Sequence, residues 1–325
     1  MKHFFYIVFG GMAAIISGVA FAYGGASLWQ KAGLPLTSLA GSSLSSAALA
    51  ASSFITPVDG TTITGFKRVV RFSAEEEEDL INAAIDALPL SPNRKVSARS
   101  YVVKNLTRGD VRTELAPDKL MPIASLTKLV TAVVARRLID GDERITLTPA
   151  IMNTYGNTAG LRIGEVLRSE DLMHALLMVS SNDAAEAFAQ HYGRKKFIQA
   201  MNDFAQEVGA YRTYFADPSG LSPNNVSTAN DLIAIIDWIR VHDPRVIEIT
   251  DTKTKTVRSH TWTNPTHFLS WNYFIGGKNG YTEEANRTTA ALFELGINKN
   301  VYAVVLLGSD SRDADVVQLL TKVGE

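Results

Sequence analysis

Two residues at the start of one apolar segment have side chains suited to nucleophilic chemistry. In MPIASLTKLVTAVVARRLID, residues 121–140, Ser125 and Lys128 are three positions apart. Residues three apart on a helix share a face, so the hydroxyl and the amine should lie together in its first turn. The mostly apolar run 129–135 predicts a helix that is buried nearly all round. Burial and the helix N-terminus both disfavour an ammonium, which makes Lys128 a candidate general base beside a nucleophilic serine.

The pair alone is also compatible with a surface serine cap and a lysine that extends to solvent, because Ser-x-x-Lys is common by chance. Two further motifs favour the chemical interpretation. Ser180-Ser181-Asn182 stand at a junction between two helical patterns, and Lys278-Asn279-Gly280 precede a C-terminal hairpin pattern. Ser-x-x-Lys, a Ser-x-Asn element and Lys-x-Gly form the signature of β-lactamases and penicillin-binding proteins. Each motif is weak alone, whereas all three in this order are specific.

From about Ser97 to Gly324 the chain resembles the low-molecular-weight penicillin-binding proteins, the serine D-alanyl-D-alanine carboxypeptidases. The resemblance extends to the segments DKLMPIASLTKLVTA (118–132), IGEVLRSEDLMHALLMVSSNDAAEAFA (163–189) and FADPSGLSPNNVSTANDL (215–232). The last of these is missing from class A β-lactamases. The resemblance implies a serine DD-peptidase that hydrolyses peptidoglycan stem peptides through an acyl-enzyme, with β-lactam antibiotics as covalent inhibitors.

The resemblance also implies catalytic roles for individual residues. Ser125 would attack the carbonyl between two D-alanines, Lys128 would take its proton, and Ser180 would relay a proton to the leaving amine. Asn182 would bond the substrate amide and orient Lys128.

The third motif and the residues after it would bind the substrate. The charge of Lys278 would lie near the terminal carboxylate, and the backbone N–H groups of Ser125 and Tyr281 would form the oxyanion hole. The segment 277–282 would pair with the peptide as an added strand. The expected substrate-binding residues are Lys278, Asn279, Gly280, Tyr281 and Thr282.

Two departures from the family pattern keep alternatives open. Asn279 stands where the family usually has Thr, and Ser181 stands where Gly is common. Because the hydroxyl at position 279 is lost, a DD-endopeptidase, which needs no free terminal carboxylate, is the first alternative. A catalytically impaired wall-binding relative is the second. A β-lactamase is the third, although 182–278 contains no convincing acidic loop to activate a deacylating water.

The composition limits the other functions. The formal net charge is −1 over 325 residues, with no basic tail of the kind that binds nucleic acid. Cysteine is absent, which excludes disulfides and thiolate catalysis. The six histidines show no HExxH-like spacing, and His174 lies in an apolar helical pattern typical of a core or groove residue. We therefore predict no metal and no cofactor.

The N-terminus predicts export. Residues 4–29 carry no charge, and about 20 apolar residues suffice to span a bilayer. Ala20-Phe21-Ala22 also suits a signal peptidase. Either interpretation places the rest of the chain on the extracytoplasmic face of the membrane, in the periplasm or cell wall. We favour a retained anchor, because the apolar stretch exceeds the usual signal-peptide core of about 7–15 residues.

The remaining patterns predict an α+β fold. We expect an anchor or signal segment at 1–30, a Ser/Ala-rich linker at 31–73 and a catalytic domain at 74–325, with a helix after Glu75–Glu78. Strand patterns form one hairpin at 100–116, with Gly109 in its turn, and a second at 288–308. Helical patterns cover 165–192, 195–209, the segment after the caps Ser227 and Thr228, and 311–324. This order predicts an antiparallel sheet flanked by helices, with an inserted all-helical region.

Overall fold

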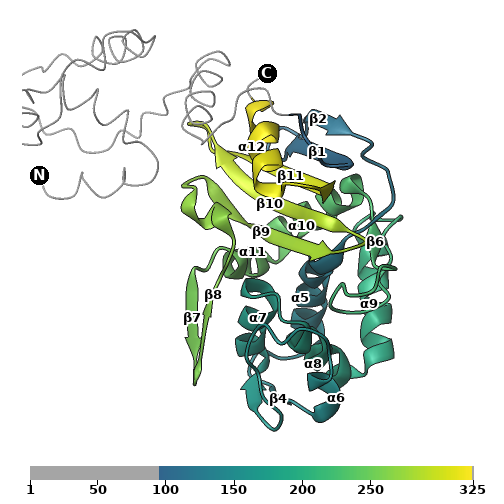
Figure 1. The fold of residues 1–325 in the computed structure, drawn as a ribbon, viewed down its shortest axis with the longest axis vertical. Coiled ribbons are helices and arrows are strands. Elements are labelled where there is room, and N and C mark those ends of the chain that lie inside the picture. The colour runs from purple at the N-terminus through teal and green to yellow at the C-terminus, as the bar shows by residue number, and fades with distance from the viewer. Residues whose placement is uncertain (1–94, 324–325) are drawn as a thin grey trace, which may run out of the picture. The chain divides into compact units, whose positions relative to one another are not determined.

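A computed structural model describes residues 95–323 of the chain (Figure 1). The predicted membrane segment at 1–30, the linker at 31–73, the start of the catalytic domain at 74 and the helix after Glu75–Glu78 lie outside the described residues. Within residues 95–323, no helix is both long enough and apolar enough to cross a membrane.

A five-stranded antiparallel sheet forms one layer of the domain (Figure 1). Its strand order is β2-β1-β11-β10-β9. The strands are β1 (Ser100–Asn105), β2 (Val111–Leu115), β9 (Phe274–Thr282), β10 (Asn286–Leu295) and β11 (Asn300–Ser309). Both predicted hairpins are confirmed, and Gly109 has the positive φ of 86° that its turn requires. The sheet joins distant segments, because β1 pairs with β11 along its whole length.

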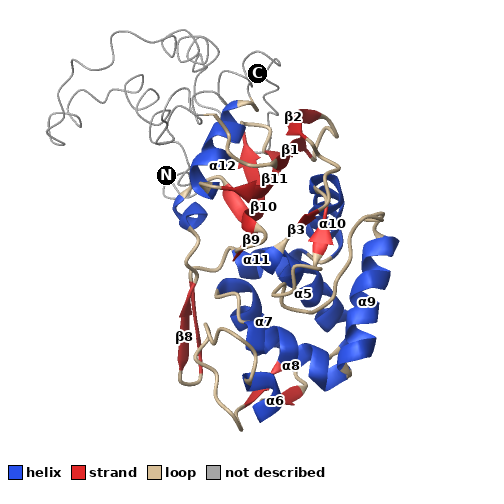
Figure 2. Cartoon of the chain, turned by 45° about the vertical axis from the view of Figure 1, so that its right-hand side comes forward, coloured by secondary structure: helices blue, strands red, loops and turns tan. Residues whose placement is uncertain are grey.

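Helices cover both faces of this sheet (Figure 2). On one face lies α12 (Arg312–Thr321), and the helical region lies on the other. That region contains α5 (Thr127–Leu138), α6 (Pro149–Met152), α7 (Ser169–Met178), α8 (Asn182–Tyr192), α9 (Arg194–Glu207), α10 (Ala229–His242) and α11 (Pro244–Thr250). The predicted α+β fold with an inserted helical region is therefore confirmed.

The sequence of β11 explains why it lies at the centre of the sheet. Successive side chains of a strand point to opposite faces. In β11, Ala303, Val305 and Leu307 pack into the core shared with the helical region. The alternating Tyr302 and Val304 pack into the core under α12. A strand buried on both faces needs a continuous apolar run, which NVYAVVLLG supplies.

Several elements differ from the sequence prediction. Residues 121–122 form the short strand β3 (Met121–Pro122), which pairs with β6 (Val226–Ser227), and the α-helix begins only at Thr127. Ser125 instead lies in a 3-10 turn, η2 (Ala124–Leu126). Ala124, at the start of this turn, has a left-handed φ of 50°, which no α-helix accommodates.

Two short antiparallel strand pairs were not predicted, and one of them includes residues 166–168, where the sequence predicted the start of a helix over 165–192. They pair β4 (Arg144–Thr146) with β5 (Val166–Arg168) and β7 (Thr254–Val257) with β8 (His260–Thr263). A second 3-10 turn, η3 (His267–Ser270), precedes β9. Strands of three or four residues are too short for the alternation that identifies longer strands.

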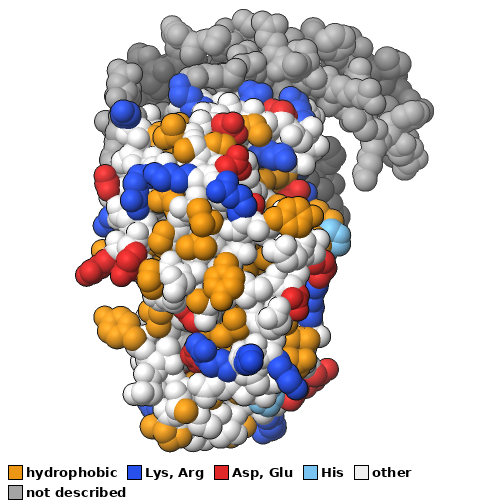
Figure 3. Space-filling model, turned by 90° about the vertical axis from the view of Figure 1, so that its right-hand side faces the viewer, with side chains coloured by type: hydrophobic (Ala, Val, Ile, Leu, Met, Phe, Trp, Pro, Cys, Tyr) orange, Lys and Arg blue, Asp and Glu red, His pale blue; other side chains and the backbone are white. Residues whose placement is uncertain are grey.

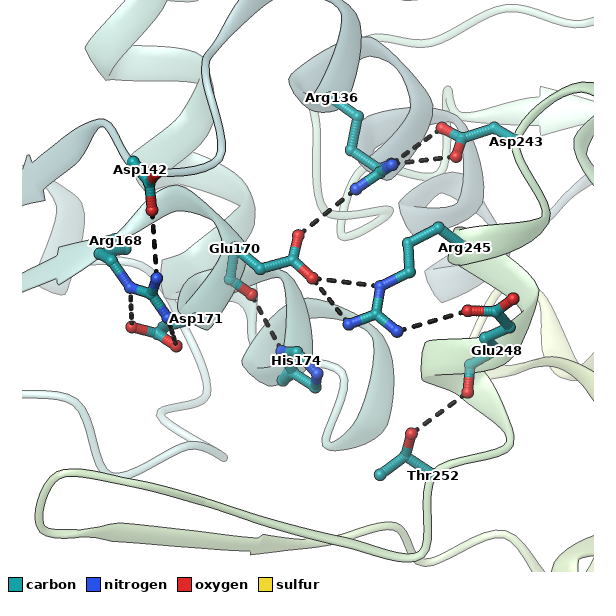
Figure 4. Close-up of polar contacts among 10 residues, drawn as sticks. All are labelled: Arg136, Asp142, Arg168, Glu170, Asp171, His174, Asp243, Arg245, Glu248 and Thr252. Atoms are coloured by element: carbon teal, nitrogen blue, oxygen red, sulfur yellow. Dashed lines mark hydrogen bonds and ion pairs between the residues drawn. The ribbon is translucent and has the colours of Figure 1, made fainter.

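A network of ion pairs ties the helical region together at Glu170, in the first turn of α7 (Figure 4). One Glu170 oxygen accepts from Arg136 Nη1 at 3.3 Å, and the other accepts from Arg245 Nη2 at 2.8 Å. Arg136 Nε also lies 3.0 Å from Asp243 Oδ2. Arg136 belongs to the last turn of α5, where a cation suits the helix dipole. The network therefore fixes the ends of three helices.

His174 lies beside this network, on α7. Its ring is buried, and Nδ1 lies 2.9 Å from the Glu170 carbonyl oxygen. It is a core residue, in agreement with the prediction. In the part of the chain that the structure describes, no group of three or more His, Cys, Asp or Glu side chains could hold a metal ion.

The molecular face seen in Figure 3 is chemically mixed. Hydrophobic side chains there are interspersed with blue and red charged ones. Exposed hydrophobic residues scattered in this way are normal for a protein surface.

Glu170→Gln should lower the free energy of unfolding by about 1–2 kcal/mol, because a neutral amide can satisfy only one of its two arginine partners. Urea unfolding monitored by circular dichroism measures this change. The matched control is Glu248→Gln: the Glu248 side chain is 62% exposed and, within residues 95–323, forms an ion pair only with Arg245. That variant should change the free energy by less than about 0.5 kcal/mol. Equal losses in the two variants would contradict a structural role for the network.

Candidate active site

The first motif places an amine and a hydroxyl in direct contact. Lys128 Nζ lies 3.0 Å from Ser125 Oγ. Lys128 stands in the first turn of α5, and its side chain is fully buried. The contact spans the junction between η2 and α5, so it does not require both residues to be in one α-helix.

Two carbonyl oxygens complete the surroundings of this amine. Asn182 Oδ1 lies 2.7 Å from Lys128 Nζ, and the backbone oxygen of Ser219 lies 2.6 Å from it. Burial lowers the pKa of Lys128 well below its ordinary value. The positive charge of Lys278 lowers that pKa further, whereas the negative charge of Asp217 raises it. The net effect favours the neutral amine, as the sequence predicted.

The second motif lies at the junction of α7 and α8. Ser180 adopts a left-handed φ of 59°, which is uncommon for a residue with a side chain. Ser181 caps α8 by accepting the Ala184 N–H at 3.1 Å. Asn182 therefore begins the helix, and its Nδ2 donates to the Tyr155 carbonyl at 2.7 Å. That bond fixes the amide orientation and leaves Oδ1 toward Lys128.

The third motif connects the edge strand β9 to the second. Lys278 Nζ donates to Ser180 Oγ and to the Asn279 carbonyl, each at 3.0 Å. Lys278 is buried, and burial lowers its pKa to about 7, with the charge of Arg312 acting in the same direction. Arg312, at the start of α12, is thus a second cation whose charge acts on Lys278.

Gly280 allows β9 to approach the serine closely. A Cβ at this position would lie 2.8 Å from the Ser125 backbone nitrogen and 3.0 Å from Ala124 Cβ. Contacts this short do not occur between real side chains and backbone, so any larger residue would push the strand away from Ser125. The glycine at the third position of the Lys-x-Gly motif is therefore required for packing.

Some backbone N–H groups of β9 point to the outer edge of the sheet, away from β10. Gly277 donates its N–H to Thr250 Oγ1 at 2.8 Å, away from β10. Alternate residues of a strand direct their N–H groups to the same side. The N–H of Tyr281 therefore also points to the open edge, where the oxyanion hole was predicted. Tyr281 is 60% exposed, and its ring centroid lies 5.6 Å from the Arg287 guanidinium carbon.

The side chains of Asn279 and Thr282 make hydrogen bonds within the protein. Asn279 Nδ2 donates to Thr266 Oγ1 at 2.8 Å, and Thr289 Oγ1 donates to Asn279 Oδ1. Thr282 Oγ1 accepts the Ala285 N–H at 3.1 Å, in the turn that leads to β10. These two predicted substrate-binding residues thus lie on the correct strand, but their side chains are directed to intramolecular partners.

The structure brings the three motifs into one hydrogen-bonded cluster. Comparison with known proteins identifies their family. Residues 87–310 match the family model described as D-alanyl-D-alanine carboxypeptidase. The chain belongs to this family. It is a serine-type peptidase of the D-alanyl-D-alanine carboxypeptidase kind, as the three motifs predicted.

Individual relatives cover most of the described domain. The chain is 30% identical over 249 residues to the D-alanyl-D-alanine endopeptidase of Escherichia coli K12, covering 70% of this chain and 77% of that one. It is 31% identical over 253 residues to the endopeptidase of Pseudomonas aeruginosa, covering 71% and 78%. The crystal structure of penicillin-binding protein D2 from Listeria monocytogenes in its cefotaxime-bound form superposes with a TM-score of 0.64. The Listeria monocytogenes protein is 27% identical to this chain, and the match covers 72% of this chain and 99% of that one.

Sequence reasoning missed three contributors to the site. Tyr155 and Ser219 take part through backbone carbonyls, to which any residue type could contribute, so their side chains gave no signal. Arg312 acts through its charge from a helix far along the chain. Only the similarity of the segment 215–232 to the family pointed toward Ser219.

The electrostatics of this site predict that Lys278 titrates near pH 7. Below that pH it is an ammonium, and above it a neutral amine. In protein with ¹³C-labelled lysines, NMR titration should show one Cε signal with a midpoint near 7, and Lys278→Arg should remove it. Arg312→Gln should raise the midpoint, because a neighbouring positive charge is lost. A Lys278 signal that stayed charged beyond pH 9 would contradict this electrostatic description.

Proposed function

We propose that this enzyme hydrolyses the bond between two D-alanines in peptidoglycan stem peptides through an acyl-enzyme on Ser125. The observation that carries the proposal is the position of Lys128 Nζ, 3.0 Å from Ser125 Oγ and close to two carbonyl oxygens. No metal or cofactor takes part in the proposed reaction.

The three neighbours of the amine direct its lone pair. A neutral amine has two N–H donors and one lone pair. The oxygens of Asn182 and Ser219 can only accept hydrogen bonds, so they occupy both donors. The lone pair is left facing Ser125, whose hydroxyl can donate. Lys128 is thereby oriented as a general base toward the nucleophile.

The reaction then follows from the neighbouring groups. Ser125 Oγ bonds to the carbonyl carbon while its proton passes to Lys128. The oxyanion receives hydrogen bonds from the N–H groups of Ser125 and Tyr281, each worth about 10²–10³ in rate. The C–N bond breaks as the proton that Lys128 took is relayed through Ser180, which is hydrogen-bonded to Lys278, to the leaving amine, and Lys128 becomes neutral again. A water then gives a proton to Lys128 and attacks the ester carbonyl, and that proton passes to Ser125 Oγ as the ester C–O bond breaks.

Substrate recognition would use β9 and the two cations beside it. The open edge of β9 can accept an extended peptide as an additional strand. Lys278, with the charge of Arg312 nearby, suits a terminal carboxylate, as a carboxypeptidase requires. The predicted binding roles of Gly280, Tyr281 and Thr282 belong to this proposal through the strand's backbone.

A DD-endopeptidase is the second candidate, and Asn279 favours it. Its amide bonds Thr266 and Thr289, so both polar atoms already have partners within the protein. Asn279 has no hydroxyl, and its amide is already bonded, so the middle of the third motif offers no side-chain hydroxyl to a free carboxylate. The relatives from Escherichia coli and Pseudomonas aeruginosa are both named endopeptidases.

The proposal includes the setting and the inhibitors of the enzyme. Residues 1–30 would export the chain and tether it to the extracytoplasmic face of the membrane, or be cleaved as a signal. β-Lactams would acylate Ser125 and act as covalent inhibitors. The cefotaxime-bound form of the Listeria monocytogenes relative supports that part of the proposal.

Ser125→Ala should abolish the covalent adduct with a fluorescent penicillin and lower D-alanine release by at least about 10³-fold, because the nucleophile is lost. Gel fluorescence and mass spectrometry of the intact protein measure the adduct. Ser270→Ala, an exposed serine in the turn before β9, is the control and should react like the wild type. An adduct on the Ser125→Ala variant would refute the proposal.

Two substrates distinguish the two candidate functions. The wild-type enzyme should release D-alanine from a free pentapeptide and also cleave a D-alanyl cross-linked dimer. Asn279→Thr should raise the pentapeptide-to-dimer rate ratio about tenfold, the effect of one hydrogen bond to a charged group. Mass spectrometry of the products measures the ratio. Cleavage of the dimer alone would replace the carboxypeptidase with the endopeptidase, and activity only in Asn279→Thr would identify an impaired relative.

A further inference from the structure

Asp217 organises a loop next to the site through an unusual number of hydrogen bonds. Its Oδ1 accepts from Ser219 N at 2.6 Å, Ser219 Oγ at 2.8 Å and Gly220 N at 2.7 Å. Its Oδ2 accepts from Ser222 N at 2.7 Å. All four donors belong to the residues that directly follow it, and Asp217 itself is buried. The carboxylate therefore fixes the conformation of residues 219–222, while the Asn225 side chain bonds the backbone N–H and carbonyl of Asp217.

This loop is docked against the start of α5. The Ser219 carbonyl accepts from Lys128 Nζ at 2.6 Å, and the Pro218 carbonyl accepts from Thr131 Oγ1 at 2.6 Å. Gly220 has a φ of 86°, and a Cβ there would lie 1.9 Å from the Ala124 carbonyl oxygen. The loop thus contacts the residue before the nucleophile and the lysine after it, and small shifts of its backbone would move the Lys128 acceptor.

We infer that Asp217 is a positioning residue for Lys128: its carboxylate holds the Ser219 carbonyl in the place where that oxygen occupies one N–H of the amine. This inference rests on the proposed function, in which Lys128 takes the proton of Ser125. If the Ser219 oxygen moves away, the amine can rotate, and its lone pair no longer faces Ser125. Asp217 itself touches neither the substrate nor the reacting atoms.

The charge of Asp217 contributes a second effect. Among the described residues, the charges that act on Lys128 are Lys278 from β9, which lowers its pKa, and Asp217, which raises it. The uncharged groups in contact with its amine are Ser125, Asn182 and the Ser219 carbonyl. Removing the negative charge should therefore lower the pKa of Lys128 further, so that the neutral form persists to lower pH.

Asp217→Asn tests both effects. The asparagine side chain has the size of aspartate and keeps one acceptor oxygen. Its NH₂ group would face the Ser222 N–H, so that bond is lost, and the negative charge is removed. The second-order rate constant for acylation by a fluorescent penicillin should fall about 10²-fold, the usual effect of a small misplacement of a catalytic group. The acid limb of its pH profile, which follows deprotonation of Lys128 in the free enzyme, should move to lower pH.

Asp231→Asn is the matched control. Asp231 Oδ2 also holds a loop, by accepting from Arg212 N and Thr213 Oγ1, each at 2.8 Å, but it is not in contact with Lys128. This variant should lose comparable thermal stability yet keep the wild-type rate constant and pH profile. A merely structural role of Asp217 would make the two variants alike, and that outcome overturns the inference.

Further outcomes are distinguishable. If the wild type forms no adduct at all, both the proposed function and this inference fail. If it forms one on Ser125 and Asp217→Asn keeps the wild-type profile, only the inference fails. Should Asp217→Asn not fold by circular dichroism, Ser219→Ala decides, because it removes a single bond to Asp217. That folded variant should acylate about fivefold more slowly, and a wild-type rate would overturn the inference.

Discussion

The structure depends on one buried amine. Lys128 has no contact with solvent, so its charged form loses hydration that the protein replaces only in part. Three segments meet to bond it: η2 through Ser125, α8 through Asn182 and the loop at 217–222 through Ser219. Each of these segments has a constraint of its own. Ala124 in η2 has a left-handed φ, the Ser181 side chain caps α8, and the Asp217 carboxylate bonds the loop. The fold thus holds hydrogen-bond partners in fixed positions around the Lys128 amine, which in water would be protonated.

The sheet supplies a part of the site that the helices cannot provide, namely an open strand edge. A helix terminus offers hydrogen-bond donors, but an extended peptide needs the open edge of a strand. Strand β9 is that edge, and Gly280 lets it pass against the backbone of Ser125. Through Lys278 the same strand reaches Ser180, at the junction of two helices. The substrate-binding edge and the catalytic cluster are therefore one connected unit.

The sequence predicted the parts of this arrangement that depend on side-chain identity. The long apolar runs of β10 and β11 and the capped helices predicted the elements, and the three motifs predicted which side chains meet. Features that depend on backbone conformation were not predictable. Ser125 lies in a 3-10 turn that begins at a left-handed Ala124, and the carbonyls of Tyr155 and Ser219 have no residue preference. The short strand pairs β4–β5 and β7–β8 contain too few residues to show a period of two, and the direction of the Asn279 amide depends on Thr266 and Thr289.

The pairing of β1 with β11 has a consequence for the order in which the molecule can form. The first strand of the sheet is synthesised early, yet its neighbour along the whole of its length comes from near the end of the domain. Contacts so distant in sequence are slow to establish, because the intervening chain must be ordered first. Ser125 and Lys128 are translated well before Lys278 and Gly280. The chain that emerges from the ribosome therefore contains its nucleophile before its substrate edge, and the site is complete only when the last strands join the sheet.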